Sequence, residues 1–310
     1  MDVRPICCVS LMLILSTAGL AAAASNPLFE MNDVFVGGQD GIHTYRIPSV
    51  ICTRKGTVLV FCEGRRDRQD DGSPTHLVLK RCLGDPVTGL PSRVAAARPA
   101  LGDRSKARPL AWEPIQVLLS SKENDAYMNP VPVIDQSTGV IFLFVNHYAH
   151  YGKEEDLGRG DVQTLLLKSS DEGATWSDPV DLTPSVGRVA LGPGIAIETT
   201  HGLLIAPTYA GVIYSGDRGK SWKAGSAVDG PLNETQIAEL ADGSLMLNLR
   251  GAPIRTIFIS KDYGRTWGPP RKDPATIGMR SRRDCAAAGS TWSTRPPRNS
   301  RPPSPTTTWR

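Results

Sequence analysis

Three stretches of the sequence gather the residue types that hold anions and transfer protons. They are "TYRIPSV" at 44–50, "CEGRRDRQDDGSPTH" at 62–76 and "NETQIAELADGSLMLNLR" at 233–250. Arginine makes forked, charge-assisted hydrogen bonds to carboxylates, and Asp and Glu are common general acids and bases. The charged residues that stand out are Arg46, Arg65, Arg66, Asp67, Asp70, Asp71, Glu234 and Arg250. These stretches are the candidates for a binding or catalytic site.

A second set of carboxylates belongs to a repeated motif, Ser-x-Asp-x-Gly-x-x-Trp, called the Asp box below. It occurs as "SSDEGATW" at 169–176, "SGDRGKSW" at 215–222 and "SKDYGRTW" at 260–267. Successive box aspartates are 46 and then 45 residues apart, at Asp171, Asp217 and Asp262. A period of about 45 residues that holds roughly four strands is typical of a β-propeller blade.

The box aspartates are predicted to be structural. Three aspartates spread around a ring cannot meet at one site, so the carboxylates that do chemistry must lie elsewhere. In a turn between strands, an Asp side chain accepts hydrogen bonds from backbone N–H groups and Gly adopts a positive φ. The box Trp is expected to pack its ring between neighbouring blades.

Short strands separated by turns dominate the chain from about residue 33 to 270. Apolar runs of strand length, rich in Val, Ile and Leu, lie at 57–64, 76–81, 140–148, 163–170, 202–215 and 244–250. The stretches "QSTG" at 136–139 and "ADGS" at 241–244 predict hairpin turns. No helical period of useful length is present, so the predicted fold class is all-β.

A fourth, altered Asp box precedes the three regular copies. "KRCLGD" at 80–85 resembles the beginning of a box, and "AWEP" at 111–114 resembles its end. The residues between them are rich in Arg, Ala and Pro. Residues 86–110 are therefore predicted to form a solvent-exposed insertion or loop.

The two ends of the chain differ in composition from its body. Residues 1–24 combine Arg4, an apolar run and a small-residue exit, which predicts a secretory signal peptide cleaved around 22–24. The alternative is an uncleaved anchor, although the apolar run is short for a membrane span. The Arg/Pro-rich residues 279–310 contain no Ile, Leu, Val, Phe or Tyr and are predicted to be a disordered tail.

Charge and cysteine content exclude several function classes. The net charge is +4, but residues 280–310 hold seven Arg and one Asp, so the rest of the chain carries about −2. No nucleic-acid partner is therefore expected. After signal cleavage no stretch could cross a bilayer, and four cysteines remain that could pair: Cys52, Cys62, Cys82 and Cys285. Their spacing matches no metal site, and no nucleotide or haem signature is present, so no cofactor is predicted.

The combination of Tyr-Arg-Ile-Pro, repeated Asp boxes and Glu-x-Gln before a strand ending Asn-x-Arg resembles the exo-α-sialidase (neuraminidase) family. The likeness, to animal enzymes including the lysosomal sialidase and to bacterial ones, covers roughly 30–278. It implies a six-bladed β-propeller, of which this chain would contain four to five blades. It also implies a retaining glycoside hydrolase that removes terminal sialic acids from glycoproteins, gangliosides and oligosaccharides. The implied location is lysosomal or extracellular, reached through the secretory pathway.

The resemblance assigns the arginines to substrate binding. Arg46 and Arg250 correspond to two of the three triad arginines that clamp the substrate carboxylate, through forked hydrogen bonds. Arg65 resembles the pocket arginine beside the triad, with Arg66 as an equally basic neighbour. The alternative for Arg46 is a surface arginine on a strand.

The resemblance also assigns the carboxylates and the pocket lining. Asp70 best matches the acid/base aspartate, and Asp71 is the alternative by a shift of one residue. Glu234 resembles the glutamate that activates a tyrosine nucleophile, the alternative being a surface glutamate in the sequon Asn233-Glu234-Thr235. Further lining residues, for which core packing is the alternative, are Met128, Asn129 and Tyr209.

The sequence departs from the family pattern after about residue 275. No position there matches the third triad arginine or the tyrosine nucleophile, so the chain is interpreted as C-terminally incomplete. Two functions remain in view: an exo-α-sialidase, and a catalytically inactive, lectin-like propeller that binds sialic acid. A third possibility is a purely structural propeller. The combined presence of four charged residues argues against it: Arg46, Asp70, Glu234 and Arg250.

Overall fold

A computed structural model describes residues 33–84, 111–122, 125–149, 162–230, 232–251, 254–277 and 308–309. The predicted signal peptide, the 86–110 insertion and residues 279–307 and 310 of the tail lie outside the described residues. Strands dominate the described part of the chain, and its helical element is the single turn α2 (Thr183–Val186). The all-β prediction is confirmed.

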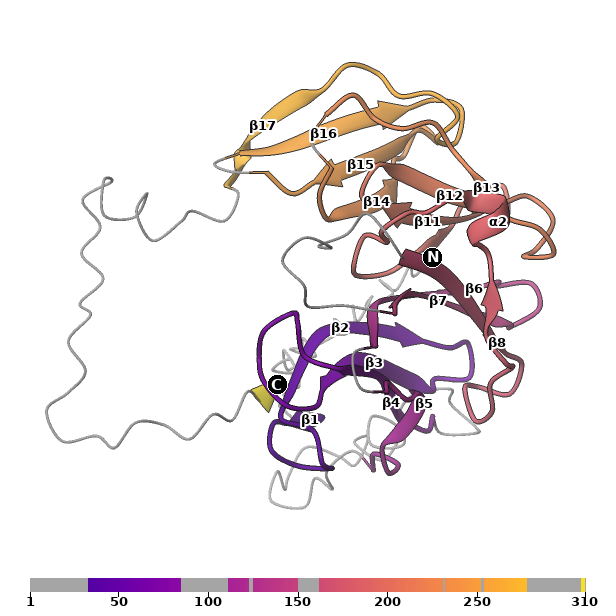
Figure 1. The fold of residues 1–310 in the computed structure, drawn as a ribbon. Coiled ribbons are helices and arrows are strands. Elements are labelled where there is room, and N and C mark those ends of the chain that lie inside the picture. The colour runs from indigo at the N-terminus through magenta and orange to yellow at the C-terminus, as the bar shows by residue number, and fades with distance from the viewer. Residues whose placement is uncertain are drawn as a thin grey trace, which may run out of the picture. The chain divides into compact units, whose positions relative to one another are not determined.

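Most strands fall into four antiparallel groups of four, numbered here in chain order (Figure 1). The first group contains β2 (Thr44–Cys52), β3 (Val58–Arg65), β4 (Thr75–Cys82) and β5 (Gln116–Leu119). The second contains β6 (Ala126–Ile134), β7 (Ile141–Tyr148), β8 (Val162–Ser169) and β9 (Val180–Asp181). The third contains β10 (Ile197–Glu198), β11 (Leu204–Thr208), β12 (Gly211–Ser215) and β13 (Lys223–Ala224). The fourth contains β14 (Thr235–Glu239), β15 (Leu245–Leu249), β16 (Ile254–Ser260) and β17 (Arg271–Ile277).

Two further pairings complete the topology. Thr75 pairs in parallel with Ala126, which joins the first two groups into one eight-stranded sheet. The short strands β1 (Phe35–Val36) and β18 (Thr308–Trp309) pair with each other in a separate two-stranded sheet.

The predicted strands and hairpins agree with this topology, with one correction. The run at 202–215 is not one strand: it forms β11 and β12, which are joined by a tight turn at Tyr209 and Ala210. The hairpin predicted at 136–139 closes through Gly139 N donating to Asp135 O (2.8 Å), and that at 241–244 through Gly243 N donating to Leu240 O (2.9 Å).

Middle strands of the first three groups are largely buried on both faces, whereas β15 and β16 of the fourth group alternate buried with half-buried residues. In β7, Ile141, Leu143 and Val145 belong to a core shared with the first group, whereas Phe142 and Phe144 belong to a core shared with the third. Side chains alternate between the two faces of a strand, so burial on both faces requires a continuous apolar run such as "IFLFV". A third core joins the third and fourth groups.

Each Asp box is a closed network of hydrogen bonds. In the first, Asp171 Oδ1 accepts hydrogen bonds from Ser169 Oγ (2.8 Å) and Thr175 N (2.9 Å), and Oδ2 accepts from Thr175 Oγ1 (2.6 Å). Gly173 N donates to Ser169 Oγ (2.9 Å). The boxes at Asp217 and Asp262 repeat these contacts.

The boxes also join each group to the one before it. The residue after each box aspartate has a positive φ (Glu172 62°, Arg218 60°, Tyr263 61°). Glu172 accepts a hydrogen bond from Thr53, Arg218 pairs with Asp135 at 3.2 Å, and Tyr263 meets His201 edge-on. Each of these partners lies in the first hairpin of the preceding group. The box tryptophans add to the same joints, for example Trp222 against Phe144 at 4.6 Å between ring centroids.

The antiparallel order gives each group two opposite ends. First strands begin and second strands finish at one end, which we call the site end. The first hairpins and the Asp boxes lie at the other end, which we call the box end.

Candidate functional site

All the predicted site residues lie at the site end. The first strands contact one another in chain order, β2 with β6, β6 with β10 and β10 with β14. Arg46 and Asn129 are near the beginnings of β2 and β6, and Glu234 directly precedes β14. Arg65 ends β3 and Arg250 directly follows β15, both second strands of their groups.

Arg65 is the centre of a buried charge network. Its side chain is fully buried, and its Nε and Nη2 donate to Glu63 Oε2 at 3.3 and 2.9 Å. Glu63 is also fully buried, and its Oε1 accepts a hydrogen bond from Asn129 N (3.0 Å). Because Glu63 and Arg65 are two residues apart on one strand, their side chains share a face. The network therefore joins the first group to the second at the site end.

Burial and pairing act on these two groups in opposite directions. Burial raises the pKa of Glu63 above its ordinary value, more than Arg65 and the Asn129 N–H lower it. Burial alone would lower the pKa of Arg65, but the carboxylates of Glu63 and Asp71 outweigh it, so the pKa of Arg65 is raised. The guanidinium therefore keeps its charge at the base of the site.

The loop after β3 brings Asp71, rather than Asp70, to the arginines. Asp71 Oδ1 lies 2.6 Å from Arg65 Nη2 and 3.9 Å from Arg46 Nη1, and its side chain is 59% exposed. Asp70 instead pairs with Arg68 at 2.9 Å and accepts a hydrogen bond from Gly72 N (3.0 Å). Of the two aspartates, Asp71 is therefore the one that faces both Arg46 and Arg65.

Neighbouring residues of the cluster do not share its environment. Arg66 and Asp67 are exposed, whereas the adjacent Arg65 is fully buried. The two basic neighbours, equivalent in the sequence, are therefore distinct in the structure: Arg65 holds the network and Arg66 faces solvent.

The first strands of the first two groups are distorted next to this cluster. The pairing of β2 with β3 shifts register between Arg46 and Ser49, and that of β6 with β7 shifts between Met128 and Val131. Ile47 and Asn129 have positive φ values of 52° and 55°. A positive φ at a β-branched residue is rare, and bulges next to active sites re-aim side chains.

Glu234 and Arg250 form the second cluster of the site end. Arg250 Nη1 lies 2.6 Å from Glu234 Oε2, and Arg250 N donates to Glu234 O at 2.8 Å. Both side chains are about one-third exposed, at 30% for Glu234 and 35% for Arg250. Glu234 N donates to Asn233 Oδ1 (2.8 Å), so the sequon asparagine is hydrogen-bonded within this turn.

Residues 193–194 connect β2 with β14, the strands that carry or adjoin the two clusters. Ser49 Oγ donates to Gly194 O, and Gln236 Nε2 donates to Pro193 O. Among the described residues, no ion pair or hydrogen bond links the Arg46–Arg65–Asp71 cluster directly to the Glu234–Arg250 pair.

The weaker pocket candidates occupy the same end. Met128 is 6% and Asn129 is 7% exposed, and Asn129 takes part through its backbone N–H. Tyr209 is half-buried in the turn after β11, and its N–H donates to Ala190 O (2.8 Å). The preceding carbonyl, Thr208 O, accepts a hydrogen bond from Thr235 Oγ1 (2.8 Å), which places this turn next to Glu234.

Sequence reasoning missed Glu63, Ser49 and Gln236. Glu63 could have been found, because a Glu and an Arg two residues apart on an apolar strand must share a face and neutralise each other. Ser49 and Gln236 could not, since their partners at 193–194 are more than forty residues away in the sequence.

The described residues contain no cluster of His, Cys, Asp and Glu side chains that could hold a metal ion. Cys52, Cys62 and Cys82 are free thiols, and Cys285 lies outside the described residues. Within the described ranges, no helix has the length and apolar character needed to span a membrane.

Comparison with known proteins identifies the family. A family model described as a BNR repeat-like domain matches residues 102–299, well over half of the chain. A sialidase of Bacteroides fragilis is 29% identical over 248 residues, which cover 74% of this chain and 44% of the relative. An exo-alpha-sialidase of Aspergillus fumigatus is 30% identical over 231 residues, covering 68% and 52%. The chain belongs to the exo-α-sialidase family.

The solved structures agree with this at the level of the fold. The solved structure of the Hadza microbial sialidase Hz136 superposes with a TM-score of 0.61 at 24% identity, covering 75% of this chain and 47% of that one. The predicted likeness to the sialidase family is thus confirmed. The chain spans about half the length of the curated sialidases it matches.

Proposed function

We propose that this chain supplies the substrate-carboxylate clamp and the proton-transfer groups of an exo-α-sialidase. Such an enzyme removes terminal sialic acids with retention from glycoproteins, gangliosides and oligosaccharides. The observation that carries the proposal is the convergence of Arg46, Arg65 and Asp71 at the same end of the strand groups as the Glu234–Arg250 pair.

The arginines suit an anionic sugar. Arg46 and Arg250 are partly exposed, at 44% and 35%, so their guanidinium groups are accessible to a substrate carboxylate. A guanidinium binds a carboxylate with two parallel hydrogen bonds. Arg65 acts differently, because it is buried and holds Asp71 in place.

Asp71 is proposed as the general acid and base, in place of Asp70. It would protonate the leaving glycosidic oxygen and later take a proton from the attacking water. Its exposure lets it exchange protons with solvent, while Arg65 and Arg46 fix its direction. Asp70 is turned toward Arg68 and remains the alternative.

Glu234 is proposed as the base that accepts a proton from a tyrosine nucleophile. Sialidases use tyrosine because a neutral phenol approaches the carboxylate-bearing anomeric carbon with less repulsion than a carboxylate does. Arg250 orients Glu234 through their 2.6 Å contact.

A second function, sialic-acid binding without hydrolysis, rests on the arginine clamp alone. Arg46 and Arg250 are partly exposed, and a guanidinium clamp binds a carboxylate without any nucleophile beside it.

Hydrolysis of a fluorogenic sialic-acid glycoside by the full chain tests the proposal and separates the two functions. Turnover that falls by about a hundredfold or more in Asp71→Asn, but not in the matched control Asp70→Asn, supports an enzyme with Asp71 as its acid/base. Turnover lost only in Asp70→Asn would contradict the assignment of Asp71. No turnover, with retained binding of free sialic acid, would favour the binding function.

We also propose that the four strand groups are consecutive blades of a six-bladed propeller. The regular box-to-hairpin joints and the shared cores support this arrangement, since each group shares a core with the next one in chain order. An experimental structure in which two consecutive groups do not share a core would contradict it.

A secretory route is proposed from residues 1–24. Expression in a secreting host should give a mature protein whose first residue lies just after the Ala-rich exit. N-terminal sequencing that still begins at Met1 in the secreted protein would contradict this.

A further inference from the structure

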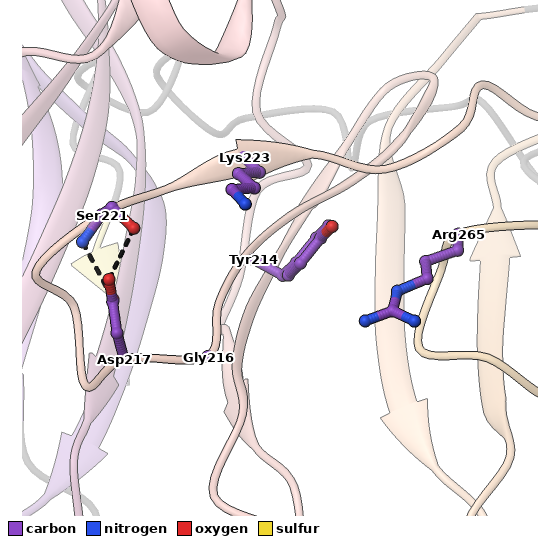
Figure 2. A pocket seen from close by; sticks show the side chains of 6 residues that line it. All are labelled: Tyr214, Gly216, Asp217, Ser221, Lys223 and Arg265. Atoms are coloured by element: carbon purple, nitrogen blue, oxygen red, sulfur yellow. Dashed lines mark hydrogen bonds between the residues drawn. The ribbon is translucent and has the colours of Figure 1, made fainter.

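A pocket lies at the box end, away from the candidate site. Its volume is about 240 Å³, and Figure 2 shows its lining side chains. It lies between the Asp-box loop of the third group and that of the fourth. The lining residues are Tyr214, Gly216, Asp217, Ser221, Lys223 and Arg265.

The pocket lining carries a net charge of +1, from two cations and one carboxylate. Lys223 and Arg265 are exposed, and neither forms an ion pair within the described part of the chain. Asp217 keeps its negative charge, but its oxygens are directed into the box: Oδ1 accepts from Ser215 Oγ (2.7 Å) and Ser221 N (2.9 Å), and Oδ2 accepts from Ser221 Oγ (2.5 Å). The two cations are therefore the groups that offer free hydrogen-bond donors to an anion.

The walls of the pocket are fixed by the fold. Tyr214 pairs with Lys223 across β12 and β13, so the two side chains stand on one face, and the tyrosine packs against the core shared with the fourth group. The Arg265 loop is tied to the third group by Ser226. Ser226 N donates to Gly264 O (3.1 Å), Ser226 Oγ donates to Arg265 O, and Trp267 Nε1 donates to Ser226 O (3.0 Å).

The side chains of Tyr214, Lys223 and Arg265 differ in chemistry and line the same pocket. The guanidinium of Arg265 extends from the fourth group toward Tyr214, and Lys223 lies beside the tyrosine on the neighbouring strand (Figure 2). A guanidinium fork matches a planar carboxylate or a sulfate, an ammonium adds a point charge, and an aromatic face packs against the C–H groups of a sugar. The volume is smaller than that of pockets for drug-sized ligands, which start at roughly 300 Å³.

We propose that this pocket is a second glycan-binding site, which takes a single anionic sugar residue, a carboxylated or sulfated pyranose. The sugar ring stacks on Tyr214, and its anionic group is bound between Lys223 and Arg265. The site is separate from the sialidase site and does not depend on the function proposed there.

Titration of the full chain with glucuronic acid, galactose sulfate and neutral galactose, followed by calorimetry or saturation-transfer NMR, tests this proposal. The two acidic sugars distinguish a carboxylate from a sulfate as the preferred group, and binding of either supports the site. Each of Lys223→Ala and Arg265→Ala should weaken binding about tenfold, as loss of one charge-assisted contact predicts. Binding should also weaken as salt is raised.

Two matched variants serve as controls. Lys220→Ala and Lys261→Ala each remove an exposed lysine of an Asp-box loop that does not line the pocket; both should leave the affinity unchanged. Tyr214→Phe should also bind, and Tyr214→Ala should not, with folding checked by circular dichroism. The proposal is overturned if neither acidic sugar binds, if galactose binds equally well, or if Lys223→Ala and Arg265→Ala bind as the unchanged chain does.

Discussion

The site end and the box end of the strand groups place carboxylates in different environments, although both use the same residue types. At the box end, the carboxylate of each aspartate accepts hydrogen bonds from hydroxyl and backbone N–H groups of its own eight-residue motif. At the site end, Asp71 and Glu234 are paired with arginines and remain partly exposed. A carboxylate committed to its own turn stabilises a joint, whereas one that is held by cations and open to solvent can act on a ligand.

Backbone strain is distributed in the same way. At the box end, the positive φ values recur at equivalent positions and belong to a repeated turn. At the site end, Ile47 and Asn129 are isolated cases within strands, next to bulges. Strain of this kind persists where the surroundings over-determine it, which is common at binding sites.

Removing one partner of the buried pair at the site end should have the largest effect on stability. Arg65→Ala leaves the Glu63 carboxylate fully buried without its cation, and should lower the free energy of unfolding by about 3–5 kcal/mol. Urea denaturation of the full chain measures this. The double variant Glu63→Gln with Arg65→Ala is the control and should recover part of the loss; equal stability of Arg65→Ala and the unchanged chain would contradict the network.

At the box end, Gly219→Ala should have the next largest effect on stability. Gly219 has φ +75°, and an added Cβ would collide with the ring of Phe142 in the second group. Strain and overpacking together should cost about 2–4 kcal/mol. Gly139→Ala is the matched control, because its φ is +77° and nothing lies within 4 Å, so it should cost only about 1 kcal/mol. Thermal unfolding should show a larger loss of stability for Gly219→Ala than for Gly139→Ala. Equal losses of stability would show that the box loop does not pack against Phe142 of the second group.

Asp171→Asn should have a moderate effect that depends on pH. Hydrogen bonds from the Thr175 hydroxyl and N–H lower the pKa of Asp171 from its ordinary 3.8 to about 2. A lowered pKa stabilises the folded state above the ordinary value, and the contribution is lost as the pH falls through the folded-state value. Loss of hydrogen bonds should cost about 1–2 kcal/mol near neutral pH.

The pH dependence gives this variant its own test. The unchanged chain and Asp171→Asn should converge in stability as the pH is lowered from 3.8 toward about 2. Urea denaturation at each pH measures the difference in free energy of unfolding between the two proteins. A difference that stays constant over this range would show that the charge of the Asp171 carboxylate does not contribute to stability.

Substitutions of the exposed aspartates at the site end should have the smallest effect on stability. Asp71→Asn and Asp70→Asn should each change the free energy of unfolding by less than about 1 kcal/mol, because both side chains are 59% exposed. A loss of several kcal/mol in Asp71→Asn would mean that Asp71 supports the fold like the box aspartates, and would weaken its proposed catalytic role.

The repeating part of the fold could be predicted from the sequence because it is local. The box residues satisfy one another within eight positions, and the strands that flank them are marked by apolar runs. The run at 202–215 was misjudged because Pro207, Thr208, Tyr209 and Ala210 carry no Asn-Gly or Asp-Gly turn signal, although β11 ends there.

The site could be predicted only in part because its geometry is not local. The motifs identified Arg46, Arg65, Glu234 and Arg250 as candidates, but the register that buries Arg65 against Glu63 is set by pairing with β2 and β4. The choice between Asp70 and Asp71 depends on how a loop turns, and Arg68 and Gly72 turn Asp70 away. A pattern of residue types does not contain that information.

The most direct test of the account is whether the two ends bind different ligands. Calorimetric titration of the full chain with the unsaturated, glycal form of sialic acid should show a high-affinity binding step, distinct from weaker binding at the box-end pocket, that Arg250→Ala abolishes and Arg265→Ala leaves unchanged. That result would place sialic-acid recognition at the site end. No binding to the unchanged chain, or binding that Arg265→Ala abolishes and Arg250→Ala does not, would contradict it.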